Sequence, residues 1–153
     1  MTTDNQVLSQ KDLMLTRLIH NLDKSEFAIL NRDLQKLSLS NIQALVIIYL
    51  TNNDDKETFQ KNLEIEFGVT NPTMTVSLKS MISKGLIIKT KSISDGRYYS
   101  LHLTSAGKEM YEKCMSVYKN IEEINKSILN DKEEQEYRRL TQKLIHGLAQ
   151  KEK

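Results

Sequence analysis

The chain is poor in cysteine, proline and glycine. Its 153 residues include one cysteine, one proline and five glycines. A single cysteine excludes an internal disulfide framework and any zinc site built from several cysteines. Few glycines and prolines disfavour an all-β fold, which needs many turns, and favour helices. The composition therefore predicts a mainly helical protein that forms one compact domain or two small lobes.

A long apolar run and an excess of one charge are also lacking. The longest apolar run, Ala44 to Leu50, is far too short to span a membrane. The opening residues MTTDNQVLSQ show no basic segment followed by an apolar one, so we expect no secretory signal. These features predict a soluble, cytoplasmic protein with no membrane partner. The net charge of +2 excludes a generally basic surface, so nucleic-acid binding would need a local patch of charge.

Motifs for catalysis or metal binding are missing as well. There is no pairing of a nucleophile with a base, no phosphate-binding loop and no pair of catalytic acids, so we expect neither an enzyme nor a cofactor. His20, His102 and His146 are far apart in sequence and none has a carboxylate at ligand spacing, which gives no support to a metal site. Cys114 lies in an apolar stripe without a basic neighbour on its own face, which predicts an inert thiol.

The spacing of apolar residues predicts helices in the first third of the chain. A first helix is expected over about residues 5–31. Residues 41–50 are almost wholly apolar after their first turn and could form a buried strand or a buried helix. Their position between helical segments, and the cap that Ser38 or Ser40 can provide, favour the helix.

Two short helices in the middle of the chain are joined by a tight turn. The first, over residues 58–67, ends at Gly68, which tolerates a positive φ. The second begins at Asn71 and Pro72, with Asn71 as the N-cap and the proline at the first helical position. Its predicted inward stripe consists of Met74, Leu78, Met81 and Ile82. This is the arrangement of a helix-turn-helix, with the second helix in the recognition position.

A β-hairpin is predicted directly after the second helix. Residues 86–90 and 98–103 have the composition and alternation of strands, and residues 94–97 have the composition of a turn. Leu101 and Leu103 are expected to face the core. A helix-turn-helix followed by such a hairpin has the order of a DNA-reading helix and its wing.

Basic residues are concentrated on the second helix and the hairpin. From Lys79 to Arg97 five basic residues are accompanied by one acid, Asp95, whereas residues 53–70 are acidic. Lysine and arginine that meet phosphates release counterions, while threonine, asparagine and valine can contact base edges or the thymine methyl group. Solubility is the competing explanation for charges on a surface turn. The candidate DNA-binding residues are Asn71, Pro72, Thr73, Thr75, Val76, Lys79, Lys89, Lys91, Asp95 and Arg97.

Three motifs of this segment resemble the MarR family. They are Lys84-Gly85-Leu86-Ile87, Asp95-Gly96-Arg97 and the LHLTSAG run of residues 101–107, which are similar to the family's KGLI, D-x-R and L-x-LT-x-x-G motifs. The resemblance covers roughly residues 38–107 and implies a homodimeric winged helix-turn-helix regulator whose recognition helix enters the major groove. It also implies that Arg97 reaches the minor groove and that Asp95 braces it. The chain departs from the pattern at Lys89, where the family often has arginine.

The flanking helices have long apolar stripes. One is expected from Thr104, as N-cap, to Ile128, and Asp131 with Glu134 has the pattern of a capping pair for a last helix. A small chain cannot cover such stripes by itself, whereas packing against a second copy would cover them and hold two recognition helices roughly 34 Å apart. The expected fold is a mainly α winged helix-turn-helix, with a DNA-binding domain over residues 38–103 and helical dimerisation regions over residues 1–37 and 104–153.

The hypothesis from sequence is a sequence-specific transcriptional regulator, a repressor that binds palindromic operator DNA as a homodimer. The alternative is a winged-helix module that binds protein and does not bind DNA. The resemblance also implies a small aromatic or phenolic effector bound between the dimer helices and the reading domain. Core or interface packing is the competing explanation for the residues that could line such a site. They are His20, Tyr49, Met110 and Tyr111.

Overall fold

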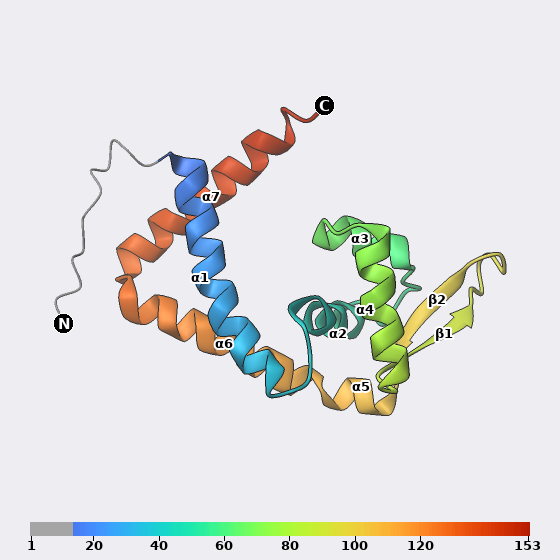
Figure 1. Ribbon diagram of the computed structural model, residues 1–153. Coiled ribbons are helices and arrows are strands. Elements are labelled where there is room, and N and C mark those ends of the chain that lie inside the picture. Colours follow the sequence, from blue (N-terminus) through green and yellow to red (C-terminus); the bar gives the residue numbers. More distant parts are fainter. Residues whose placement is uncertain (1–13) are drawn as a thin grey trace. The chain divides into compact units, whose positions relative to one another are not determined.

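Residues 14–153 are described by the structure, a computed structural model (Figure 1). The chain forms two compact units, one ending at Met115 and the other comprising Ser116–Lys153. The predicted fold class, mainly helical with a small hairpin wing, is confirmed. In chain order the elements are α1 (Leu15–Gln35), α2 (Asn41–Asn52), α3 (Gln60–Phe67), α4 (Asn71–Ser83), β1 (Ile87–Lys91), β2 (Tyr99–Leu103), α5 (Ser105–Glu109), α6 (Tyr111–Ile128) and α7 (Asp131–Ala149).

The start of α2 is capped as the sequence predicted. The Ser40 hydroxyl accepts a hydrogen bond from the Gln43 amide at 3.2 Å, and Gln43 Oε1 accepts one from the Ser40 amide at 3.1 Å. Reciprocal bonds of this kind satisfy donors that the first helical turn leaves unpaired. Residues 41–50 are therefore a buried helix, and the strand alternative is wrong. The first helix ends at Gln35, later than predicted, and its predicted start before residue 14 lies outside the described residues.

The helix-turn-helix consists of α3 and α4, which pack against each other (Figure 1). Gly68 ends α3 in the left-handed region, with a φ of 60°, as predicted. The N-cap of α4 is Thr70, so the prediction that Asn71 is the cap was wrong by one residue. The inward stripe is Met74, Leu78 and Met81.

Ile82 was wrongly placed in this stripe. Its side chain is 38% exposed, because the three buried residues define a narrow face and a residue one step beyond Met81 is rotated away from it.

The wing is an antiparallel hairpin of β1 and β2. Ile87 pairs with Leu103 at one end of the ladder and Lys91 pairs with Tyr99 at the other. The Leu101 amide donates to the Thr58 carbonyl at 2.8 Å, so the segment before α3 is tied to the outer edge of β2. Leu101 is buried as predicted, while Leu103 is half-buried. Because β2 also packs against α2, the hairpin is anchored to the helical core at its base.

Thr104 caps the helix that follows the wing, as predicted. Its hydroxyl accepts from the Gly107 amide at 3.1 Å and donates to the Gly85 carbonyl. The helix is interrupted at Met110, so the single continuous helix predicted from Thr104 is divided into α5 and α6. The apolar stripe runs through the interruption, and for this reason the spacing alone did not show it.

The second unit contains most of α6 and all of α7. The N-cap of α7 is Asn130, whose Oδ1 accepts from the Glu133 amide at 2.9 Å, so the predicted Asp131 cap was wrong by one residue. Arg138 joins the two helices through ion pairs with Glu122 at 3.2 Å and Glu134 at 2.9 Å. Among residues 14–153, no helix combines the length and the apolar character that crossing a membrane requires.

Candidate nucleic-acid interface

The outer face of α4 presents polar and small apolar side chains to solvent. Val76 is 70% exposed, and Thr73 and Lys79 are exposed beside it. Thr75 is half-buried, because its hydroxyl accepts a hydrogen bond from Gln60 Nε2 at 2.9 Å. The exposed side chains can reach base edges, whereas Thr75 is already tied to the start of α3.

Asn71 has a structural partner that the sequence did not reveal. Its Nδ2 donates to Glu64 Oε2 at 2.9 Å, and Lys61 Nζ lies 3.6 Å from the other oxygen of the same carboxylate. Glu64 is buried, although it is a charged residue. Asn71 therefore fastens the first turn of α4 to α3, in addition to any contact it makes with an external partner.

Arg97 and Asp95 form a two-point ion pair on the wing. Arg97 Nη2 lies 2.7 Å from Asp95 Oδ2, and Arg97 Nε lies 3.0 Å from Asp95 Oδ1. The hydrogen bonds from Arg97 lower the pKa of Asp95, and the same contact raises the pKa of Arg97. The Arg97 side chain is still 81% exposed, and its guanidinium carbon lies 5.8 Å from the centre of the Tyr98 ring. The charge is thus held in a defined direction while it remains accessible.

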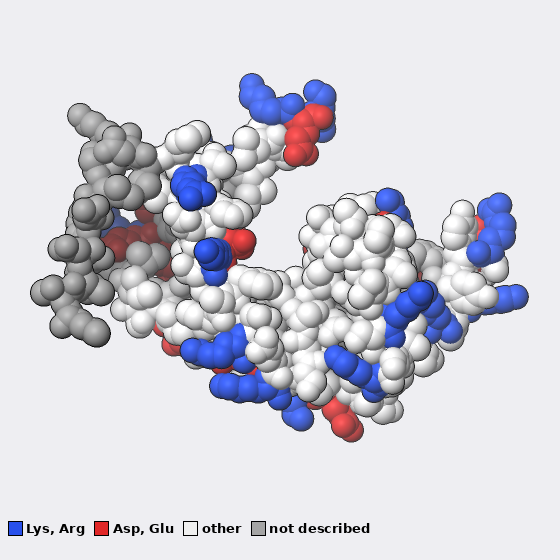
Figure 2. All heavy atoms as spheres, viewed as in Figure 1, with Lys and Arg blue, Asp and Glu red and all other residues white. Residues whose placement is uncertain are grey.

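A groove of about 470 Å³ lies between the helix-turn-helix and the wing. Among the predicted DNA-binding residues it brings together Asn71, Lys89 and Arg97. In Figure 2 the lysine and arginine side chains stand out on the hairpin that borders it. The other lining residues were not predicted to take part in binding. They are Phe59, Gln60, Lys61, Glu64, Tyr98, Tyr99 and Leu101.

The exposed pair Tyr98 and Tyr99 is the signal that could have extended the sequence prediction. Tyr99 begins β2 and Tyr98 lies between it and Arg97. Both side chains are exposed, and exposed aromatic side chains are frequent in binding surfaces. Gln60 gave no comparable signal, because its role depends on the contact with Thr75 across the turn.

Glu57 holds the start of the loop that joins the two strands, which we call the wing loop (residues 92–98). Its carboxylate accepts hydrogen bonds from the hydroxyls of Ser92 and Ser94 and from the amide of Ile93, each at 2.7 Å. These three bonds, that from Ser92 first, lower the pKa of Glu57 from its ordinary 4.5 to about 2. Because Glu57 is 35 residues or more from its partners, no local pattern revealed the contact.

The depressed pKa of Glu57 predicts a pH-dependent stability. The folded-state pKa lies below the unfolded one, so the contribution is fully present above pH 4.5 and is lost as the pH falls from 4.5 towards 2. We expect wild type to exceed Glu57→Gln in free energy of unfolding at pH 6, and the difference to shrink progressively below pH 4.5. Urea unfolding at several pH values measures this difference, and one that does not change with pH would contradict the assignment.

The residues predicted to form an effector pocket have varied surroundings. His20 lies on the exposed face of α1, and Met110 and Tyr111 lie where α5 meets α6. Tyr49 contacts Phe67 edge-on, with the centres of the two rings 6.0 Å apart. Their joint role in ligand binding stays a prediction.

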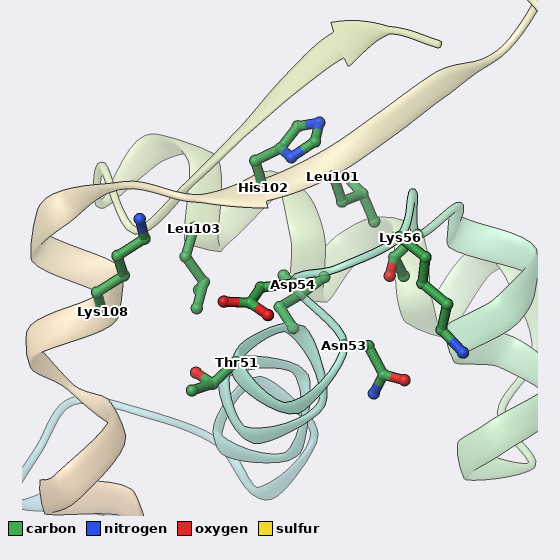
Figure 3. A pocket seen from close by; sticks show the side chains of 10 residues that line it. Thr51, Asn53, Asp54, Lys56, Leu101, His102, Leu103 and Lys108 are labelled. Carbon is green, nitrogen blue, oxygen red and sulfur yellow. The ribbon is translucent and has the colours of Figure 1, made fainter. Parts of the chain in front are cut away.

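A pocket of about 440 Å³ lies elsewhere in this unit, between the end of α2, β2 and α5 (Figure 3). Leu101 and Leu103 extend from β2 towards Thr51 and Asp54 there, and Lys108 lies at its side. None of the predicted effector residues lines this pocket.

Cys114 is buried, and burial raises the pKa of its thiol to about 11. The thiolate, which is the reactive form, is therefore scarce at neutral pH. This agrees with the inert thiol that the sequence predicted.

The geometry defines the class of the protein. A capped helix-turn-helix, an exposed face on its second helix and a two-stranded wing with an outward arginine together make a winged helix-turn-helix. The model of the Transcriptional regulator SarA/Rot family matches residues 28–114, which is more than half of the chain. The protein belongs to this family of transcriptional regulators.

Solved structures of MarR-type winged-helix regulators are similar to this chain. The match to MepR in the S. aureus MepR–DNA complex covers 92% of this chain and 99% of the MepR chain, with a TM-score of 0.80 and 19% identity. MarR from Oenococcus oeni PSU-1 covers 87% and 99%, with a TM-score of 0.70 and 27% identity. The regulator SlyA covers 91% and 96%, with a TM-score of 0.79 and 16% identity. No curated protein sequence matches the chain.

Proposed function

We propose that this protein binds palindromic operator DNA as a homodimer and acts as a repressor. The observation that carries the proposal is the groove in which the start of α4 and the wing arginine face the same space. A helix that enters the major groove and a basic hairpin beside it can contact one duplex at the same time. The similar fold of MepR, which was solved with DNA bound, supports the proposal.

The reading of bases is assigned to the exposed face of α4. The Val76 and Thr73 methyl groups are suited to the thymine methyl, and the Thr73 hydroxyl can bond to a base edge. Lys79 lies on the same exposed side and is suited to a phosphate. Three further residues would position the exposed face of α4, and contact with bases is a smaller part of their role: Asn71, Pro72 and Thr75. Asn71 and Thr75 are hydrogen-bonded to side chains of α3.

The wing is assigned to the minor groove and the adjacent backbone. Arg97 projects from the wing loop with its guanidinium oriented by Asp95, and arginine is favoured where the minor groove is narrow. Lys89 and Lys91 are exposed on β1 and would contact phosphates. Their contribution would be electrostatic and would weaken as salt is raised.

The dimer is assigned to the exposed apolar residues of α1 and α7. Leu15 and Ile19 are exposed on α1, and no residue of α7 is buried although Ile145 and Leu148 are apolar. Such stripes on long helices call for a covering surface, and a second copy provides one with two-fold symmetry. The two copies of α4 would then meet half-sites one DNA turn, roughly 34 Å, apart. Residues 1–37 and 104–153 form the proposed dimerisation region, and residues 38–103 the DNA-binding domain.

An aromatic or phenolic effector is proposed to release the repressor from DNA. The candidate residues His20, Tyr49, Met110 and Tyr111 lie on α1, on α2 and at the junction of α5 with α6. A ligand bound among these elements could change how the helices adjoining the helix-turn-helix are held, and so bias the equilibrium between binding and non-binding arrangements.

Selection from random duplex DNA tests the proposed function. The full chain is mixed with a library of random duplexes, and bound molecules are recovered and sequenced over several rounds. We expect enrichment of a palindrome whose half-sites are centred about 10 base pairs apart. Failure to enrich any sequence, together with no binding of duplex at low salt, would favour the protein-interaction module instead.

The proposed dimer makes a prediction for paired substitutions. Ile145 on α7 is 64% exposed and Ile65 on α3 is 71% exposed, so an aspartate costs little in either isolated chain. We expect Ile145→Asp to raise the dimer dissociation constant about tenfold, because it places charge in an apolar interface. Ile65→Asp is the matched control and should leave the dimer intact. Light scattering at micromolar concentration measures both, and a monomeric wild type would contradict the dimer.

A further inference from the structure

We propose that Glu57 is a positioning residue for the wing, which fixes the wing loop so that Arg97 is presented to DNA in one arrangement. This inference rests on the proposed function, because it takes DNA as the partner of the wing. Glu57 lies just before α3, in the acidic stretch of the sequence, and was not among the predicted site residues.

A continuous set of hydrogen bonds leads from Glu57 to Arg97. Ser92, which is buried, donates its hydroxyl to Glu57 Oε2. The Ser92 oxygen in turn accepts from the amides of Ser94 at 3.2 Å and Asp95 at 3.1 Å. Asp95 then holds both the amide and the guanidinium of Arg97. The wing arginine is thus linked, through Ser92 and Asp95, to a residue outside the hairpin.

The backbone of the hairpin makes few hydrogen bonds within the wing loop. The ladder ends at the pair Lys91 and Tyr99, and within the wing loop the backbone bonds are from the Ser92 amide to the Tyr98 carbonyl and from the Tyr98 amide to the Asp95 carbonyl. Fixing a loop residue costs conformational entropy, so a loop with few backbone bonds depends on side-chain bonds to keep one arrangement. Glu57 supplies three charge-assisted bonds to three consecutive residues, and bonds of this kind are stronger than neutral ones.

A carboxylate so close to a DNA-facing basic loop would ordinarily weaken binding. It adds negative charge near the phosphates, which lowers the electrostatic attraction of Lys91 and Arg97. Both carboxylate oxygens of Glu57 are, however, directed to donors of the wing loop. The same hydrogen bonds lower the pKa of the group to about 2, so it stays ionised even well below pH 4.5. Repulsion between this carboxylate and the phosphates would disfavour an acid at this position. The ordering of the wing loop by its hydrogen bonds gives a reason for its presence.

Amide hydrogen exchange without DNA tests the ordering itself. In Glu57→Ala we expect the amides of Ile93 and Asp95 to exchange on the order of tenfold faster than in wild type, while the amides of α4 keep their rates. The unchanged α4 amides separate a local effect from a loss of folding. Unchanged exchange at Ile93 and Asp95 would overturn the proposal, whether or not the protein binds DNA.

A double-mutant cycle on DNA binding tests the positioning role. With the duplex selected by wild type, we expect Glu57→Ala to weaken binding about fivefold, and Arg97→Ala to cost at least threefold less in the Glu57→Ala background than in wild type. Glu66→Ala removes one exposed acid from α3 and is the charge-matched control, which should not weaken binding. Additive costs of Glu57→Ala and Arg97→Ala would overturn the positioning role. A wild type that binds no duplex would overturn the proposed function and the DNA part of this inference. Faster exchange of the wing-loop amides in Glu57→Ala would still support the ordering of the loop by Glu57.

Discussion

Arg97→Ala is expected to weaken binding of the selected operator by about ten- to a hundredfold. Arg97 is the basic residue of the wing loop, and Asp95 holds its guanidinium at two points while most of its side chain stays exposed. Its loss removes the contact assigned to the minor groove from both halves of a dimer. Fluorescence anisotropy with labelled operator, measured as a function of salt, gives the affinity and the salt dependence together.

Two variants show whether the loss of affinity in Arg97→Ala depends on the position of Arg97 or only on its charge. Arg139→Ala removes the same charge from an exposed arginine of α7, and it should leave the affinity nearly unchanged. Arg97→Lys keeps the charge but loses the planar fork that Asp95 orients, so it should recover only part of the affinity. Equal losses for Arg97→Ala and Arg139→Ala would show that the wing has no special contact with DNA.

Gly107→Ala is expected to destabilise the fold by about 2–3 kcal/mol, through overpacking. A Cβ at Gly107 would lie 2.1 Å from the Leu86 carbonyl oxygen and 3.0 Å from Leu103 Cδ2. The carbonyl cannot move freely, because it also accepts the Thr104 amide at 3.0 Å. Helix α5 would have to shift away from the base of the wing. Thermal unfolding should show a melting temperature lower by roughly 5–10 °C.

Gly147→Ala is the matched control for this prediction. Gly147 lies within α7, and a Cβ added there meets nothing within 4 Å. Alanine is the better helix former, so we expect a gain of up to about 1 kcal/mol. The two glycine substitutions should therefore change stability in opposite directions. A neutral Gly107→Ala would mean that α5 does not approach Leu86 as closely as the structure indicates.

Local signals in the sequence predicted the elements of the reading domain. The cap at Ser40, the left-handed Gly68 and the cap at Thr104 each depend on residues within one helical turn, and all three are present. The order of two helices and a hairpin follows from the same short-range patterns. The predicted caps of α4 and α7 were wrong by one residue, because neighbouring residues such as Thr70 and Asn130 can serve equally well as caps. The later end of α1, the exposed Ile82 and the interruption at Met110 were larger errors.

The contacts that orient the site could not be predicted in this way. Glu57 meets the wing loop 35 residues or more along the chain, and Glu64 binds Asn71 across the turn. Gln60 reaches Thr75 in the same manner. Each of these polar residues looks like ordinary surface charge or polarity when only its neighbours in sequence are considered. The roles of the site residues themselves remain predictions, to be decided by the binding experiments.

The buried state of Cys114 has a practical consequence for following the wing in solution. The folded protein exposes no native thiol to a maleimide reagent, because the single cysteine of the chain is inaccessible and weakly acidic. Gly96→Cys would place one reactive thiol on the wing loop, where an added Cβ meets nothing within 4 Å. A fluorophore could then be attached at that point alone, with the natural cysteine left in place, and would report directly on the wing as duplex is added.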